Sequence, residues 1–504
     1  MKLSFKTIFQ YHKGERAWRK KEEFMSKKSK IAAVVGATVV FASAFGAVGC
    51  GGVGTEKVKL YFDGGGGSGH YNTTRNYNTL ETLAAEWNAQ SDGFEIVVNA
   101  KSLNGNRGSI TSMLSAGTAP DMLMQVGGVA NDDIGNGWYV SLNDYLEEPN
   151  PYEEGNVHWK DIYGADAIAA AQAADGVNYY VCLDNIAIGM MYNMDILAQV
   201  GITKAPETHS DFIECLETLQ QAKDEGKITA EIYCQSGLWH ESFLGNSVYG
   251  AKITAWDTDG NGMVSTYELI KAYKQNEWSL GDERFKEFLR LCYEKAEYYP
   301  SNYLGYDVSY QFAKGNLAVM DAIGNSMTTL SKNAKFNVKI TGYPVLDSAA
   351  SSFGDYTTRR GSAGLSSAYW VTNSAISKGQ EAVDACVDFL MFLTASDNNK
   401  RLVNDLGTAL PLDIKNSTVE IFADLAVQYE EDKKNGNSLM WSSCYIPESL
   451  GTSFNEKYQL AMGDYYQDSE GKLTGDAAAV IDTLNGEIDK SMNTLIEKYG
   501  WMFA

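Results

Sequence analysis

The chain has 504 residues, of which 44% are hydrophobic and 21% are charged, and this composition is typical of a globular protein. A chain of this length is expected to form at least two lobes, because single cores stop growing at roughly 250–300 residues. The 64 acidic and 42 basic residues give a formal net charge of −22, which disfavours nucleic acid and anionic lipid headgroups as ligands. A neutral or cationic ligand fits this charge better.

The amino end predicts a secretory signal. Lysines within residues 27–30 precede the uncharged run 31–48, and small residues then lead to Cys50. The pattern resembles a bacterial lipoprotein signal, which is cleaved before a cysteine that carries the lipid. We therefore expect residues 1–49 to be a leader and signal peptide, and residues 50–56 to be a linker anchored to the cell membrane. A transmembrane anchor is the alternative, although so short a run is at the lower limit for spanning a bilayer.

Hydrophobic periodicity predicts strands alternating with helices in the chain that follows. A helix expected at 80–90 has Leu80, Leu83, Ala84 and Trp87 on one face. Strands are expected at 58–62, 94–98, 120–124, 232–234 and 369–371, and a further helix at 110–116. This alternation predicts an α/β fold.

The remaining six cysteines form no C-x-x-C pair, which argues against a metal cluster or a redox motif. Most are expected to be buried thiols, and one or two disulfides stay open as an alternative. They are Cys182, Cys215, Cys234, Cys292, Cys386 and Cys444.

Seven short motifs, in order, resemble the carbohydrate-binding branch of the extracellular solute-binding proteins of ABC transporters. The most specific is SAGTAPDM at 115–122, which is similar to the family's SAGTAPDV. The others lie at 177–181, 191–197, 201–208, 312–320, 342–345 with 361–365, and 473–489, so that the resemblance covers about residues 57–495.

The resemblance implies a type II periplasmic-binding-protein-like fold, in which two α/β lobes are joined by a hinge of several strands. Lobe 1 is expected at 57–182 and 344–400, and lobe 2 at 185–341 and 401–500. The implied function is an extracytoplasmic, lipid-anchored receptor, expected to be a monomer, that binds a carbohydrate between the lobes and delivers it to the permease of an ABC importer. The length of the chain favours an oligosaccharide, and no enzymatic activity is expected.

Several polar and aromatic residues are candidate ligand contacts. Residues 235–241 are expected to be a loop in which Trp239 stacks on a sugar ring while His240 and Glu241 bond hydroxyl groups. An ordinary surface aromatic with solvated neighbours is an equal alternative. Asp184 and Asn185 follow the first hinge strand, where they either bind the ligand or cap the hinge. Further candidates are Gln125, Asn325, Trp441, Asp63 and Arg107, whereas Trp370 is expected in the core.

Residues 257–268 match the twelve-residue calcium loop of EF-hands. Asp257, Asp259 and Asn261 occupy positions one, three and five, and Gly262 occupies the turn at six. The loop predicts a structural Ca²⁺ site that rigidifies a lobe, and a chance acidic turn is the alternative. The remaining ligands would be the Met263 carbonyl, Ser265 and the bidentate Glu268.

Two other classes of protein remain as alternatives. A glycoside-acting enzyme needs two carboxylates across the scissile bond, and so acidic a chain offers many pairs without singling one out. A glycan-binding surface lipoprotein without a transporter would share the signal and the aromatic residues. Within the transport class, a polyamine is a minor alternative ligand, compatible with the negative charge.

Overall fold

The computed structural model describes residues 56–64, 78–99, 107–126, 131–173, 175–354, 363–436 and 446–503. The predicted signal peptide, Cys50, Trp441 and Cys444 lie outside these residues. The segment 302–306, with a 3₁₀ turn at Tyr303–Gly305, groups apart from 57–301 and 307–504, and the description below concerns the latter.

The first sheet has five strands in the order β2-β1-β3-β10-β4. Strand β1 is parallel to β2 and β3, whereas β10 is antiparallel to β3 and β4. The strands are β1 (Val58–Asp63), β2 (Phe94–Asn99), β3 (Met122–Val126), β4 (Tyr180–Cys182) and β10 (Ser367–Val371). The predicted strands at 58–62, 94–98, 120–124 and 369–371 are confirmed to within two residues, and Trp370 is fully buried.

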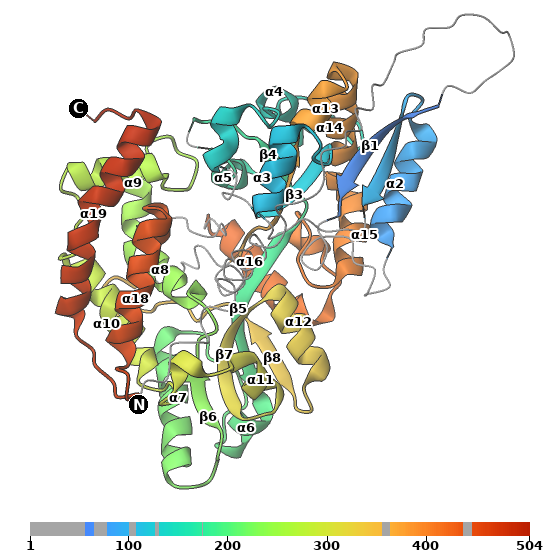
Figure 1. Cartoon of the computed structure of the whole chain (residues 1–504). Helices are drawn as coiled ribbons and strands as arrows, with labels where there is room; N and C mark the ends of the chain where they lie inside the picture. Colours follow the sequence, from blue (N-terminus) through green and yellow to red (C-terminus); the bar gives the residue numbers. More distant parts are fainter. Residues whose placement is uncertain are drawn as a thin grey trace, which may run out of the picture. The chain divides into compact units, whose positions relative to one another are not determined.

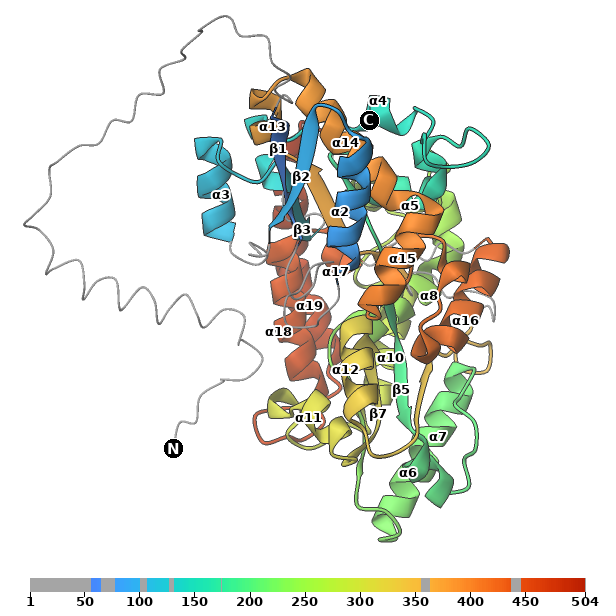
Figure 2. The ribbon, with the colours of Figure 1, turned by 90° about the vertical axis from the view of Figure 1, so that its right-hand side faces the viewer.

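Helices α2 (Thr79–Gln90), α14 (Gln380–Thr394) and α15 (Ser396–Leu406) belong with this sheet (Figure 2). The buried face of α2 consists of the four apolar residues that the periodicity predicts. The Trp87 indole donates to Asp388 at 2.7 Å, and Arg401 pairs with Glu86 at 2.7 Å. Helix α15 therefore packs with lobe 1 along its whole length, across the expected boundary at residue 400. The shorter helices of this part are α3 (Arg107–Ala116), α4 (Asn143–Leu146), α5 (Ala165–Ala170) and α13 (Asn373–Ser377).

The second sheet has the strand order β6-β7-β5-β8. Strands β6 and β7 are parallel, and β5 is antiparallel to β7 and β8. The strands are β5 (Asn185–Asn193), β6 (Glu231–Cys234), β7 (Leu317–Ile323) and β8 (Val338–Thr341). Strand β5 passes Thr341 so closely that a Cβ on Gly189 would lie 2.2 Å from the Thr341 carbonyl oxygen, which only glycine allows.

The chain crosses between the two sheets three times. Strand β4 leads directly into β5, the chain returns after β8 to β9 (Ala363–Leu365) and β10, and Leu410 pairs with Asn185 on the way back. The described residues thus form two α/β lobes, lobe 1 on the first sheet and lobe 2 on the second, joined by a hinge of three crossings.

Helices surround the second sheet. The long helices α18 and α19 pack against each other and against α10 (Figure 1). The helices are α6 (Met194–Gln199), α7 (His209–Asp224), α8 (Trp239–Trp256), α9 (Thr266–Lys274), α10 (Glu283–Ala296), α11 (Val308–Ala313), α12 (Gly324–Asn333), α16 (Ala423–Lys434), α17 (Ile446–Ser449), α18 (Thr452–Tyr466) and α19 (Ala477–Tyr499).

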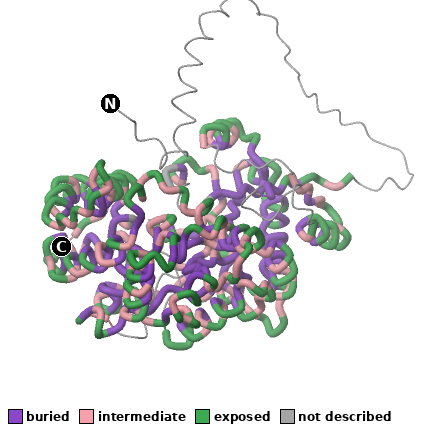
Figure 3. The backbone as a smooth tube through the Cα atoms, turned by 90° about the horizontal axis from the view of Figure 1, so that it is seen from below, coloured by how far each residue is buried: buried purple, intermediate pink, exposed green. Residues whose placement is uncertain are grey.

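Buried stretches of the chain lie mainly inside the molecule and exposed stretches mainly at its periphery (Figure 3). In the described part of the chain, five cysteines are buried free thiols, as expected for most of them: Cys182, Cys215, Cys234, Cys292 and Cys386.

Among the described residues, no helix has both the length and the apolar character needed to cross a membrane.

Candidate functional site

Candidate residues gather where parallel strands end. In parallel α/β sheets, ligands bind outside the carboxyl ends of the strands, because the following loops converge there. Strands β1 and β3 of lobe 1 end at Asp63 and Val126, and β6 and β7 of lobe 2 end at Cys234 and Ile323. The predicted contacts Asp63, Gln125, Trp239 and Asn325 all lie at or just after these ends.

The lobe 1 half is a chain of polar side chains at the end of β3. Gln125 is 2% exposed and donates to the Tyr139 hydroxyl at 2.9 Å. Tyr139 in turn donates to Asp133, which pairs with Arg107 at 2.5 Å. Burial raises the pKa of Tyr139 to about 12, so its hydroxyl stays protonated. Asp63 is fully buried.

Two buried polar atoms of this group have no hydrogen-bond partner among the described residues. They are the Gln125 Oε1 and the Arg107 Nη1. Buried polar atoms are nearly always paired, because burying an unpaired one costs roughly 1–3 kcal/mol. An acceptor and a donor are therefore available for a polar ligand at the end of β3.

The lobe 2 half is the segment between β6 and α8. The sequence predicts a loop over 235–241, and this extent is wrong because α8 already begins at Trp239. Trp239 is half-buried in the first turn, whereas His240 and Glu241 are fully buried. The loop residues that remain near the surface are Gln235 to Leu238.

His240 and Glu241 are engaged inside the lobe. His240 shares a hydrogen bond with Tyr233 at 2.9 Å and stacks on the Tyr343 ring at 4.8 Å. Desolvation lowers the pKa of His240 well below its ordinary value, so the ring is neutral. The two oxygens of Glu241 accept from Gln235, Tyr458 and Tyr466. In this conformation neither side chain reaches a solute.

Asp184 and Asn185 lie in the hinge with their polar atoms bonded to the chain. Asp184 accepts from the backbone N–H and the hydroxyl of Ser367 at 3.0 and 2.9 Å. Asn185 donates to the carbonyls of Pro411 and Leu412 at 2.9 and 3.3 Å. This is the hinge-capping role that the sequence left open for these residues.

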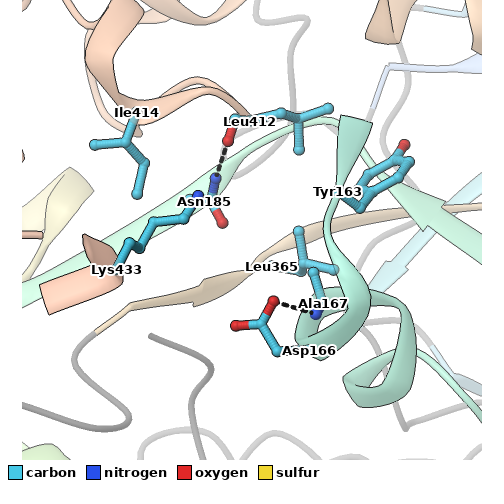
Figure 4. Close-up of a pocket in the computed structure, with 8 residues that line it drawn as sticks. All are labelled: Tyr163, Asp166, Ala167, Asn185, Leu365, Leu412, Ile414 and Lys433. Carbon is cyan, nitrogen blue, oxygen red and sulfur yellow. Dashed lines mark hydrogen bonds between the residues drawn. The ribbon is translucent and has the colours of Figure 1, made fainter. Parts of the chain in front are cut away.

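A small pocket lies beside Asn185 (Figure 4). It brings together Asp166 on α5, Leu365 on β9 and Lys433 on α16, so all the parts of the chain that meet at the hinge contribute to its wall. Asp166 and Lys433 are 267 positions apart, so no local pattern in the sequence singles them out. The remaining lining residues are Tyr163, Ala167, Leu412 and Ile414.

Asn325 is exposed in the first turn of α12. With Ser309, Ser326 and Thr329 it lines a second, open pocket. Helix α12 begins at Gly324, where a Cβ would lie 2.3 Å from the Thr408 carbonyl oxygen. This close approach fixes the start of the helix, and with it the position of Asn325.

The predicted calcium loop connects α8 to α9. One carboxylate oxygen from each of Asp257, Asp259 and Glu268 lies within 4.8 Å of the others. Asp257 accepts the backbone N–H groups of residues 260–262, and Gly262 has a φ of +85°. Burial and the neighbouring carboxylates raise the pKa of Asp259. Three converging carboxylates fit a cation that takes oxygen ligands at 2.3–2.6 Å.

Several other residues of the loop form hydrogen bonds that stabilise the loop and the start of α9. Ser265 is the N-cap residue, and its hydroxyl and backbone N–H bond the Glu268 carboxylate in a capping box. The Asn261 side chain accepts the Met263 N–H at 2.9 Å. The helix predicted to follow the loop is confirmed, with Leu269 and Ile270 buried.

A model of the family described as "Bacterial extracellular solute-binding protein" matches residues 82–413. Among curated protein sequences, none matches this chain.

Solved structures share the fold at low identity. A chitin oligosaccharide binding protein is 17% identical, with a TM-score of 0.56 over 87% of this chain and 99% of its own. The apo form of RafE from Streptococcus pneumoniae is 13% identical, with a TM-score of 0.58 over 88% and 100%. A cyclic alpha-maltosyl-1,6-maltose binding protein from Arthrobacter globiformis is also 13% identical, with a TM-score of 0.58 over 87% and 100%.

Proposed function

Because this chain belongs to the bacterial extracellular solute-binding proteins, we propose that it captures an oligosaccharide between its two lobes and delivers it to the permease of an ABC importer. Binding rather than catalysis is the activity of this family. The family also implies that the protein works outside the cytoplasm.

The observation that carries the choice of solute is the half-buried indole of Trp239, which lies in the first turn of α8 just after β6. A flat aromatic ring offers apolar area to the C–H face of a sugar. The names of the similar structures, which include a raffinose complex and a chitin oligosaccharide binder, support the same class.

Lobe 1 contributes the complementary polar groups. The free acceptor on Gln125 and the free donor on Arg107 suit hydroxyl groups, which both donate and accept. Closure of the hinge is then favoured by contacts that the solute makes to both lobes, since a ligand shifts an equilibrium only by its differential affinity for the two states. The closed form is the one that the permease recognises.

The test is binding of raffinose, maltotriose and chitotriose to residues 51–504 by calorimetry, with Trp239→Ala and Trp239→Phe. We expect one glycan to bind, a loss of about tenfold in affinity for Trp239→Ala, and a smaller loss for Trp239→Phe, because phenylalanine keeps a ring. Binding of a polyamine and no glycan would contradict the carbohydrate proposal. Loss of glycan uptake in a deletion strain would support delivery to a transporter.

We also propose that Cys50 carries a lipid that tethers the receptor to the membrane. The support is the lipoprotein-like pattern of residues 27–50 and the extracytoplasmic location that the family implies. Cys50→Ser is expected to release the protein into the medium, and mass spectrometry of the mature amino terminus identifies the modification. An unmodified Cys50 in a membrane-bound protein would contradict the anchor.

We further propose that loop 257–268 binds a structural Ca²⁺. The converging carboxylates of Asp257, Asp259 and Glu268 support it, as does the position of the loop at the carboxyl end of α8, where the helix dipole favours a cation. Asn261, Met263 and Ser265 would supply the remaining oxygens. The ion would neutralise the carboxylates and join α8 to α9.

A further inference from the structure

We infer that Lys295 and Glu241 are positioning residues of the solute site: from inside lobe 2 they hold the Gln235 amide and so fix the segment that presents Trp239. The inference rests on the proposed function, because it assigns a role to residues behind the proposed sugar platform.

The Gln235 amide bridges two buried charges. Its Oε1 accepts from the Lys295 ammonium at 2.6 Å, and its Nε2 donates to a Glu241 oxygen at 2.9 Å. Lys295 comes from α10 and Glu241 from the first turn of α8, and both are fully buried. Because the cation requires the oxygen and the carboxylate requires the N–H₂ group, only one orientation of the amide satisfies both.

The two charges depend on this bridge. Among the described residues, the hydrogen bonds of the Lys295 ammonium go to Gln235 and to the Tyr299 hydroxyl, the latter at 2.8 Å, and neither partner is a carboxylate. Glu241 accepts in addition from Tyr458, at 2.6 Å, and from Tyr466, both on α18. A buried ion that loses a partner is strongly destabilised, so these contacts hold Gln235 firmly.

The next two residues of the segment are fixed in the same way. The Ser236 N–H donates to the carboxylate of Asp321, and its hydroxyl donates to the Asp321 carbonyl at 2.7 Å. At Gly237 a Cβ would lie 2.7 Å from the Trp239 ring, so the indole lies directly over this glycine. The position of the Trp239 ring is thus restricted by the contacts of Gln235, Ser236 and Gly237.

Because the Trp239 ring is already held in place, little conformational freedom is lost when a sugar binds to it. Association loses affinity for each side chain and loop that must be immobilised, and preorganisation removes that loss. Helices α10 and α18 therefore contribute to binding although Lys295 and Tyr466 never touch the solute.

A matched pair of tyrosines on α18 separates positioning from stability. Tyr466 is buried and donates to Glu241, whereas its neighbour Tyr465 is buried and donates to the Leu289 carbonyl at 3.1 Å, away from the bridge. Tyr466→Phe and Tyr465→Phe each remove one buried hydroxyl, so both should lower the melting temperature. We expect only Tyr466→Phe to weaken glycan binding, by roughly three- to tenfold.

A second readout does not require a glycan. In protein labelled with 5-fluorotryptophan, the Trp239 resonance is assigned by its disappearance in Trp239→Phe. We expect Lys295→Met and Tyr466→Phe to shift or broaden this resonance, and Tyr465→Phe to leave it unchanged. Equal effects of the two tyrosine variants on the resonance and on affinity would overturn the inference.

The control for the proposed function is Trp239→Ala. If this variant binds the glycan as tightly as the wild type, the proposed site is wrong and the positioning role falls with it. If Trp239→Ala weakens binding while Tyr466→Phe and Tyr465→Phe behave alike, only the positioning role is wrong.

Discussion

Asp184 and Ser367 lie 183 positions apart, and both hydrogen-bond donors of Ser367 bond the Asp184 carboxylate, at 3.0 Å from the N–H and 2.9 Å from the hydroxyl. Both residues are buried where the chain crosses between the lobes. The contact clamps the first crossing, between β4 and β5, to the start of β10.

The clamp predicts a stability loss for Ser367→Ala. A hydrogen bond to a charged group contributes about 1.5–3 kcal/mol, so the free energy of unfolding in urea should fall by that amount. The control is Ser112→Ala, which removes an exposed hydroxyl bonded within its own helix and should change little. Equal effects of the two variants would contradict the clamp.

Substitution by alanine should have opposite effects on stability at two glycines that lie in different surroundings. At Gly189 the added Cβ meets the Thr341 carbonyl at 2.2 Å, so β5 and the neighbouring chain must separate, and we expect a large loss of stability. At Gly486, inside α19, the Cβ meets nothing within 4 Å, and alanine should stabilise by up to about 1 kcal/mol through helix propensity. Thermal and urea unfolding measure both, and a tolerated Gly189→Ala would contradict the close approach.

Gln125→Met should separate binding from folding. The substitution removes a buried oxygen that has no partner among the described residues, and this gain offsets the loss of the hydrogen bond from Gln125 to Tyr139, which keeps Asp133 as a partner. The stability of the free protein should therefore change little. If this oxygen accepts a sugar hydroxyl, affinity should fall by about tenfold. Unchanged affinity would remove Gln125 from the site.

Asp321 predicts a pH-dependent stability. Burial raises the pKa of this carboxyl to about 6, above its ordinary value of 3.8. The folded state therefore holds the proton more tightly than the unfolded state, and stability falls as the pH rises from about 4 through about 6. The loss amounts to roughly 3 kcal/mol, and the nearby Lys295 charge already keeps the rise in the pKa smaller than burial alone would make it.

Asp321→Asn should remove this dependence. Asparagine cannot ionise, so the stability of the variant relative to wild type should be greater at pH 7.5 than at pH 4. Urea unfolding at both values measures it. A constant difference across this range would show that Asp321 ionises at its ordinary pKa.

Calcium should stabilise the protein through loop 257–268. An ion that binds only the folded state adds about 2.7 kcal/mol at a concentration 100-fold above its dissociation constant. Asp259→Asn should lose this gain and be slightly more stable than wild type in chelator, because one of three converging carboxylates is removed while an amide oxygen can still accept the Asn261 N–H. The control is Asp468→Asn in another acidic turn, and a melting temperature indifferent to chelator in wild type would argue against the site.

The sequence alone determined what depends on neighbours along the chain. The face of α2 formed by Leu80, Leu83, Ala84 and Trp87 follows from a period of 3.6 residues, and β1, β2, β3 and β6 follow from short apolar runs. The ordered motifs indicated the family because each is a short stretch of sequence that can be recognised without its tertiary contacts.

Only the tertiary structure decided which polar residues face inward. Trp239, His240 and Glu241 are consecutive, yet α8 starts at the first of them and turns the other two into the lobe. Two of the three partners of Glu241, Tyr458 and Tyr466, lie 217 and 225 positions away, on α18. Burial and charge pairing depend on such distant residues, so no local pattern contains them, and the Lys295–Gln235–Glu241 bridge could not be predicted from the sequence.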